Sequence, residues 1–188
     1  MRLPIYLFGH PVLRKIAEPA DINAEGFKEL VDSMFTTMYE SDGVGLAAPQ
    51  IGKSIRLVVI DASPVGDKFP ECAGRKMALV NPMVEILEGD PVSRAEGCLS
   101  LPGLSEDVKR VEHIRLTWTD PEGEEHSEEI SGFLARIVQH ECDHLEGKVY
   151  TDHVSPIRRQ LIKNKLNSIA KGHTLPDYPY RTAPKKRR

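Results

Sequence analysis

Two histidines four residues apart are the first feature of this sequence that suits chemistry. His140 and His144 frame the run His-Glu-Cys-Asp-His, inside a segment with the apolar spacing of a helix. Positions i and i+4 lie about 40° apart on one helical face, so both imidazoles can bind one metal ion. Glu141 lies on the flank of that face, where its carboxylate would reach a metal-bound water. The spacing therefore indicates two metal ligands and a general base.

The third ligand of such a site must come from elsewhere in the chain. A catalytic divalent metal usually has three protein ligands and one open position. The downstream candidates, His153 and His173, lie past a break at Gly147 and match no known spacing for this motif. Cys98 lies upstream in a tightly turned segment, and its thiolate would complete a Cys-His-His site. We expect Asp143 to lie at the surface or to hold the other nitrogen of a ligating histidine.

A glycine-rich run, 43–48, fits the pattern of a dinucleotide-binding loop, and Asp61 lies 18 residues after its first glycine. That pattern requires a strand before the loop and a helix after it. Here a predicted helix comes before the run, and Pro49 and Gly52 prevent a helix from starting directly after it. We therefore reject a nucleotide cofactor and interpret the glycines as places where another chain can approach the backbone closely.

The elements that must position these residues are helices and hairpin strands. Apolar side chains at three- and four-residue spacing predict helices over 23–40, 131–146 and 156–171. Alternating or β-branched runs predict strands over 56–61, 77–87, 114–119 and 124–130. A bend is expected at Asn81-Pro82, and the turn residues 120–123 join the last two strands as a hairpin. Hairpins without strand–helix–strand units indicate an α+β domain.

Composition and charge narrow the class of protein. The chain has 188 residues, of which 40% are hydrophobic and 28% charged, as in one compact domain. No apolar run approaches the roughly 20 residues of a membrane helix, so no membrane association is expected. Three cysteines are too few for a disulfide scaffold, and we expect a cytoplasmic protein. The net charge of −3 argues against general binding to nucleic acids, DNA included.

The charge is unevenly distributed along the chain. Residues 155–188 carry ten Lys or Arg and one acid, Asp177, a net charge of +9, whereas the first 154 residues carry −12. Several prolines and a terminal Lys-Lys-Arg-Arg predict a flexible basic tail over 173–188, following a single catalytic domain over 1–172. One interpretation is a solvated end that aids solubility, and the other is an element that docks on RNA, in particular on the ribosome.

Three segments together resemble the peptide deformylase family. Its pattern is G-Φ-G-Φ-A-A-x-Q, then E-G-C-Φ-S, then H-E-Φ-D-H, where Φ is apolar. This chain reads GVGLAAPQ over 43–50, EGCLS over 96–100 and HECDH over 140–144, with Cys142 in an apolar slot. Every defined position matches, in order and with compatible gaps, and the resemblance extends over about residues 1–170.

The resemblance implies a metal-dependent amidase that removes the formyl group from N-formylmethionyl nascent chains and releases formate. The implied ligands of one divalent metal are Cys98, His140 and His144. Fe(II) is the expected metal in the cell, and Zn(II), Ni(II) or Co(II) would suit the same donors in isolated protein. Glu141 is implied as the general base, and then as the acid that protonates the leaving amine.

The implied substrate contacts come from all three motifs. The side-chain amide of Gln50 and the backbone N–H of Leu99 would donate to the oxyanion, and Gly45 would pair with the substrate main chain. The methionine would lie in an apolar pocket with His140 at its base and walls made by Val44, Phe133 and Ile137. Arg136 stands where the family often has an apolar residue, and we expect it to alter the pocket rim.

Two other functions remain open on the sequence. A metallopeptidase acting on internal peptide bonds would use the same H-E-x-x-H motif, although no downstream third ligand is found. A non-enzymatic protein associated with the ribosome or RNA would act through the basic C-terminal segment. The fold implied by the resemblance has antiparallel or mixed β-sheets packed around a central helix carrying the motif, with N-terminal and C-terminal helices, and we expect a monomer.

Overall fold

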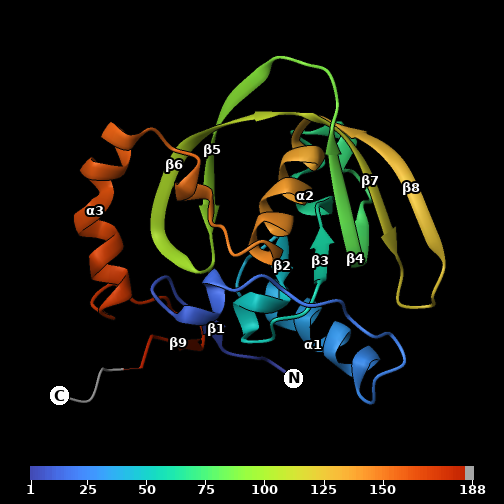
Figure 1. Cartoon of the computed structure of the whole chain (residues 1–188), viewed down its shortest axis with the longest axis horizontal. Coiled ribbons are helices and arrows are strands. Elements are labelled where there is room, and N and C mark those ends of the chain that lie inside the picture. The colour runs from blue at the N-terminus through green and yellow to red at the C-terminus, as the bar shows by residue number, and fades with distance from the viewer. Residues whose placement is uncertain (185–188) are drawn as a thin grey trace.

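A five-stranded antiparallel sheet and a long β-hairpin lie on either side of one central helix (Figure 1). The computed structural model describes residues 1–184 of the chain. In spatial order the sheet consists of β2 Gly45–Ala47, β3 Leu57–Asp61, β4 Lys76–Ile86, β7 His113–Thr119 and β8 Glu125–Ser131. The hairpin joins β5 Pro91–Cys98 to β6 Leu101–Val111. The helices are α1 Phe27–Tyr39, α2 Gly132–Leu145 and α3 Pro156–Ala170.

Strand β3 shows why the sheet is covered on both faces. Val58 and Ile60 pack in a core with α2, whereas Leu57 and Val59 pack in a second core with α1. Successive side chains of a strand point to opposite faces, so a continuous apolar run buries both. The motif helix α2 is thereby held against one face of the sheet, with its opposite side turned toward the hairpin.

The hairpin β5–β6 is a large element that the sequence analysis does not predict. Along β6 the side chains of Leu104, Glu106, Val108 and Arg110 are buried and those between them are exposed. Two of these four buried residues are charged, so the apolar alternation typical of a strand is hidden in the sequence. The leucine and valine pack in one apolar core with residues of α3.

The predicted α+β class is confirmed, and most element boundaries agree with the prediction. Helix α1 differs most, because it begins at Phe27 rather than residue 23. Gly26 precedes it with a φ of 78°, a left-handed conformation in which the chain turns instead of continuing a helix. The bend expected in β4 is present, since Asn81 has a φ of 51° and the pairing with β7 shifts between Val80 and Met83.

The C-terminal segment differs from the flexible tail that the sequence predicts. Strand β9, Tyr180–Arg181, pairs in parallel with β1, Ile5–Tyr6, near the N-terminus. The N–H of Leu7 continues this pairing by donating to the carbonyl of Arg181 at 2.8 Å. Strands pair through backbone groups, so a segment can form a strand without an apolar side-chain pattern. The basic, proline-containing composition of this segment therefore gave no sign of the strand. We call residues 175–181 the C-terminal strap; the basic residues 185–188 lie outside the described part of the chain.

Within residues 1–184, none of the helices has the length and apolar character needed to cross a bilayer.

Candidate active site

Cys98, His140 and His144 meet between the hairpin and α2. Their ligand atoms all lie within 4.8 Å of one another, and Sγ of Cys98 is 3.4 Å from Nε2 of His144. The cysteine ends β5 at the hairpin turn, whereas the histidines lie one helical turn apart on α2. A thiolate with two imidazoles is a donor set that suits divalent transition metals. The three residues therefore fit the metal that the motif implies.

Glu96 holds the outer nitrogen of His140. Its Oε2 lies 2.8 Å from Nδ1 of His140, which leaves Nε2 of that ring for a metal. Glu96 and Cys98 are two residues apart on β5, so strand alternation points both toward α2. That spacing is the signal by which the sequence reveals Glu96, once the segment is recognised as a strand.

Asp143 does not have the role that the sequence analysis considered for it. Its carboxylate does not bond a metal-ligating histidine. It accepts a hydrogen bond from Arg110 at 2.9 Å and lies 2.8 Å from Nε2 of His153. Its partners come from β6 and from the residues after α2, and within residues 1–184 no hydrogen bond joins it to His140 or His144. The expectation that Asp143 orients a ligand is therefore wrong.

Two buried arginines complete the surroundings of Glu96. Arg110 donates to both of its carboxylate oxygens, at 2.7 and 3.0 Å, and Arg136 donates to Oε1 at 2.7 Å. Burial alone would raise the pKa of Glu96, but the hydrogen bond with His140 and the charge of Arg110 hold it well below its usual range. Arg136 is only 1% exposed and also pairs with Glu112, so its guanidinium lies in this ion-pair network rather than at an open rim.

Glu141 is buried beside the ligands and points toward β2. Its Oε2 has no hydrogen-bond partner among the described residues, and burial raises the pKa of its carboxyl. A Cβ placed on Gly45 would lie 2.5 Å from Oε1 of Glu141, so only glycine leaves room for the carboxylate here. An unpartnered carboxyl with a raised pKa in a cavity suits a general base.

A backbone hydrogen bond directs the side-chain amide of Gln50 toward Cys98. The N–H of Ala47 donates to Oε1 at 2.8 Å, which orients the amide so that Nε2 donates to Ser100 at 3.2 Å and to Sγ of Cys98 at 3.4 Å.

Burial alone would raise the pKa of the Cys98 thiol, but the facing histidines, His144 foremost, lower it to about 5. The cysteine is therefore a thiolate near neutral pH, the form that binds metals.

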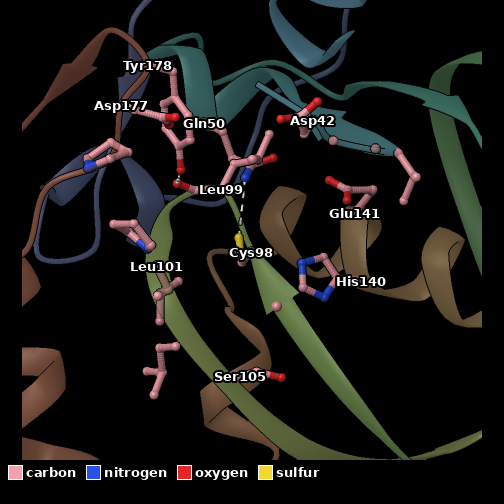
Figure 2. Close-up of a pocket in the computed structure, with 18 of the residues that line it drawn as sticks. Asp42, Gln50, Cys98, Leu99, Leu101, Ser105, His140, Glu141, Asp177 and Tyr178 are labelled. Atoms are coloured by element: carbon pink, nitrogen blue, oxygen red, sulfur yellow. Dashed lines mark hydrogen bonds between the residues drawn. The ribbon is translucent and has the colours of Figure 1, made fainter. Parts of the chain in front are cut away.

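Two adjoining cavities open beside these residues. The larger, of about 750 Å³, has Gln50, Leu99, His140 and Glu141 in its wall (Figure 2). The smaller, of about 190 Å³, is lined by the four residues expected around a methionine: Val44, Phe133, Ile137 and His140. Arg136 is also among its lining residues. The structure thus brings together the expected metal ligands, the general base, the oxyanion donors and the residues expected around the substrate.

Three residues of the site escaped the sequence analysis. Besides Glu96, Tyr150 stacks on the His140 ring with centroids 5.8 Å apart, and its hydroxyl donates to the Leu104 carbonyl at 2.8 Å. Tyr178, from the C-terminal strap, lines the larger cavity. Neither tyrosine has a pattern in the sequence that links it to the motifs, because each reaches the site only through the path of the folded chain.

Comparison with known proteins decides the family. The family model described as polypeptide deformylase matches residues 2–160. The chain belongs to the polypeptide deformylase family. It is 40% identical to the peptide deformylase of Salinibacter ruber over 183 residues, covering 95% of this chain and 94% of that relative. The peptide deformylase of Flavobacterium psychrophilum is also 40% identical, with both chains covered in full.

Solved structures agree with this assignment. A crystal structure of the deformylase from Thermus thermophilus is 40% identical, with a TM-score of 0.80 over 92% of this chain and 99% of that one. The crystal structure of a peptide deformylase from Legionella pneumophila is 38% identical in sequence, with a TM-score of 0.79, and the match covers 92% of this chain and 98% of that one. As a member of this metal-dependent family, the chain is a hydrolase that removes the N-formyl group from nascent peptides. The metallopeptidase and non-enzymatic alternatives are not supported.

Proposed function

We propose that Cys98, His140 and His144 hold one divalent metal ion, Fe(II) in the cell, and that deformylation of N-formylmethionyl peptides takes place beside it. The meeting of one thiolate and two imidazoles at the wall of a cavity carries this proposal. When bound, such a metal lowers the pKa of water toward neutrality and polarises a carbonyl oxygen. Zn(II), Ni(II) or Co(II) would suit the same donors.

Glu141 moves the proton in this reaction. It accepts a proton as water attacks the formyl carbon, and it then delivers that proton to the leaving nitrogen as the C–N bond breaks. Formate and a free α-amine result. The buried, unpartnered carboxylate with its raised pKa supports this role.

Two donors stabilise the oxyanion that forms on the formyl oxygen. They are the Nε2 amide of Gln50 and the backbone N–H of Leu99, both in the wall of the larger cavity. The hydrogen bond from Ala47 supports the first, because it holds the Gln50 amide with its N–H groups toward Cys98. Donors held in advance need no reorientation when charge develops.

The substrate lies across both cavities. Gly45 pairs with its main chain, and the methionine side chain enters the small cavity between Val44, Phe133 and Ile137. The apolar lining of that cavity, next to Glu141 and His140, supports this placement.

The decisive experiment measures formate release and bound metal together. We expect anaerobically prepared protein to release formate from a formyl-methionyl peptide without internal cleavage; oxygen is excluded because a thiolate beside Fe(II) oxidises. Glu141→Ala should keep its metal and lose turnover by about 100-fold or more, since general acid–base catalysis contributes on that order. Cys98→Ala should lose both metal and turnover. A near-normal rate for Glu141→Ala would exclude it as the base.

The setting of the reaction follows from its substrate. We place the protein in the cytoplasm, where nascent chains emerge and where its three free cysteines stay reduced. We also propose that it works as a monomer, and that the basic segment 155–188 docks it on the ribosome. The exposed lysines of α3, Lys163 and Lys165, support the docking, because the phosphate backbone of ribosomal RNA attracts such charge.

A further inference from the structure

The C-terminal strap reaches back over the hairpin turn that carries Cys98. The hydroxyl of Tyr178 donates to the backbone carbonyl of Leu99 at 2.6 Å, although the two residues are 79 positions apart in the chain. Figure 2 shows the Tyr178 ring directed at Leu99, beside Gln50 and Cys98. Tyr178 and its neighbours Leu175, Pro176 and Asp177 form one wall of the larger cavity.

The same turn is held by a second contact. The N–H of Phe8 donates to the carbonyl of Ser100 at 2.8 Å, directly after β1, and β1 in turn pairs with β9 of the strap. Two successive carbonyls, those of Leu99 and Ser100, are therefore fixed by one unit made of the chain's two ends. The Leu99 carbonyl shares one rigid peptide plane with the Ser100 N–H, and the Ser100 carbonyl shares the next plane with the Leu101 N–H. The two contacts therefore fix the chain on the C-terminal side of Leu99. The Leu99 N–H lies in the preceding plane and is joined to this fixed part through the Leu99 Cα, so its direction depends on how firmly that part is held.

We infer that Tyr178 is a positioning residue for deformylation: its hydroxyl holds Leu99 so that the Leu99 backbone N–H points at the oxyanion. The inference rests on the proposed role of Leu99 as an oxyanion donor. Tyr178 lies beyond residue 160, where the match to the family model ends, so the device belongs to the C-terminal part of this chain rather than to the region that the family model covers.

The chemistry of Tyr178 suits a permanent donor. Its ring is half-buried against the apolar core formed with α1, which directs the hydroxyl toward the turn. Burial raises the pKa of the phenol, so the hydroxyl keeps its proton throughout the pH range in which a deformylase works. A phenylalanine would keep the packing and remove only the hydrogen bond.

Tyr180 provides a matched control on the same strap. It is a half-buried tyrosine in β9, and its hydroxyl makes no hydrogen bond to any residue from 1 to 184. The strap is docked by the backbone pairing of β9 with β1, which neither Tyr178→Phe nor Tyr180→Phe removes. A difference between these variants therefore reports the hydroxyl of Tyr178 and not the presence of the strap.

The test uses full-length, metal-loaded protein and a formyl-methionyl peptide. For Tyr178→Phe we expect kcat to fall about tenfold with KM and metal content unchanged, because a donor that moves by a fraction of an ångström loses much of its effect in the transition state. Tyr180→Phe should match the wild type. As a readout independent of turnover, amide hydrogen exchange measured by NMR should be faster at Leu99 and Ser100 in Tyr178→Phe alone.

The outcomes separate this inference from the proposed function. If Tyr178→Phe has the kcat and exchange rates of Tyr180→Phe, or if its kcat falls only in proportion to lost metal, the positioning role is overturned. If the wild type itself releases no formate, the proposed function fails, whereas exchange at Leu99 still shows whether Tyr178 restrains the turn. Slower turnover with intact metal and a looser turn supports the inference.

Discussion

Glu141 occupies the space that any side chain at position 45 would fill. The GVGLAAPQ motif and the HECDH motif are thus fitted to each other at a single contact, between a glycine on β2 and a carboxylate on α2. Glycine serves here through its missing side chain and not through an unusual φ, because Gly45 is not among the positive-φ glycines. The steric argument is therefore independent of backbone strain.

Substituting Gly45 with alanine tests this contact. The added Cβ lies 2.5 Å from Oε1 of Glu141 and must displace it, so we expect kcat for formate release to fall by about tenfold or more, with metal content unchanged. Gly26→Ala, which strains the backbone at a φ of 78° but has nothing within 4 Å of the new Cβ, is the control for a general loss of stability away from the site. Equal rates for the two variants would contradict the fit.

Charged residues, rather than apolar ones alone, join the hairpin to α2. Glu96 of β5 binds Arg110 of β6 and both Arg136 and His140 of α2, all buried. Removing one partner of such a network is costly, because the remaining buried charges lose their compensation. The network also explains why a strand with buried acids and arginines is stable at this position.

Glu96→Gln tests the coupling between this network and the metal. The neutral amide cannot compensate the buried arginines or orient His140 as strongly, so we expect metal affinity to fall about 10- to 100-fold. The free energy of unfolding should fall by about 3 kcal/mol. Glu106→Gln is the matched control, because Glu106 is buried on β6 opposite Glu96 but pairs with Arg158 of α3 and not with His140. It should lose stability and keep metal affinity, as titration with a competing chelator would show.

Asp152 ties the segment after α2 to two other parts of the chain, through ion pairs with Arg14 near the N-terminus and Arg159 of α3. Burial alone would raise the pKa of its carboxyl, but Arg14 and the N–H of Val149 lower it below its usual range. A carboxyl with a lowered pKa stabilises the fold above its unfolded-state pKa, and that contribution disappears as the pH falls through the folded-state value.

Asp152→Asn should therefore be less stable than the wild type at pH 7 by about 1 kcal/mol, a modest value because Arg14 is partly in solvent. Urea denaturation from pH 7 down to pH 3 should show the gap between the two proteins narrowing below about pH 4. Asp67→Asn, at an exposed position, should follow the wild type throughout. A gap that stays constant with pH would contradict the ionic origin of the effect.

Over the whole molecule, a net charge of −3 conceals an acidic body and a basic C-terminal segment. Part of that segment is helix α3, whose basic side chains are exposed, and part is the strap, which belongs to the active site wall. Deleting the segment would therefore remove Tyr178 together with the charges. Substituting lysines that lie outside the strap changes the charge and leaves the strap in place, so the two contributions can be measured separately.

Replacing Lys163, Lys165 and Lys171 with serine should weaken co-sedimentation with ribosomes at low salt and leave formate release from a short peptide unchanged. The loss should shrink as salt increases, because the contacts neutralise phosphates. A triple serine variant of Lys28, Lys53 and Lys68, exposed lysines in the acidic body, changes the net charge equally and is the control. Equal sedimentation of both variants would exclude docking through α3.

Local spacing was enough to find the chemistry of this protein. His140, Glu141 and His144 lie within one helical turn and a half, so their relation follows from helix geometry alone. The apolar periods of α1, α2 and β7 likewise predicted those elements, because each buries one face or both in an apolar core. Cys98 was already the upstream candidate for the third ligand, the resemblance added Gln50 and Leu99, and the structure brings all three to the same cavity wall.

The tertiary structure decided what no local pattern contains. The hairpin was hidden because its buried positions include Glu106 and Arg110, which are acceptable inside only when partners from other elements neutralise them. Glu96, and not Asp143, orients His140 because β5 packs against that side of α2. Tyr178 reaches Leu99 across 79 residues because the chain's two ends pair as strands, and such pairing is made by backbone groups that every sequence carries.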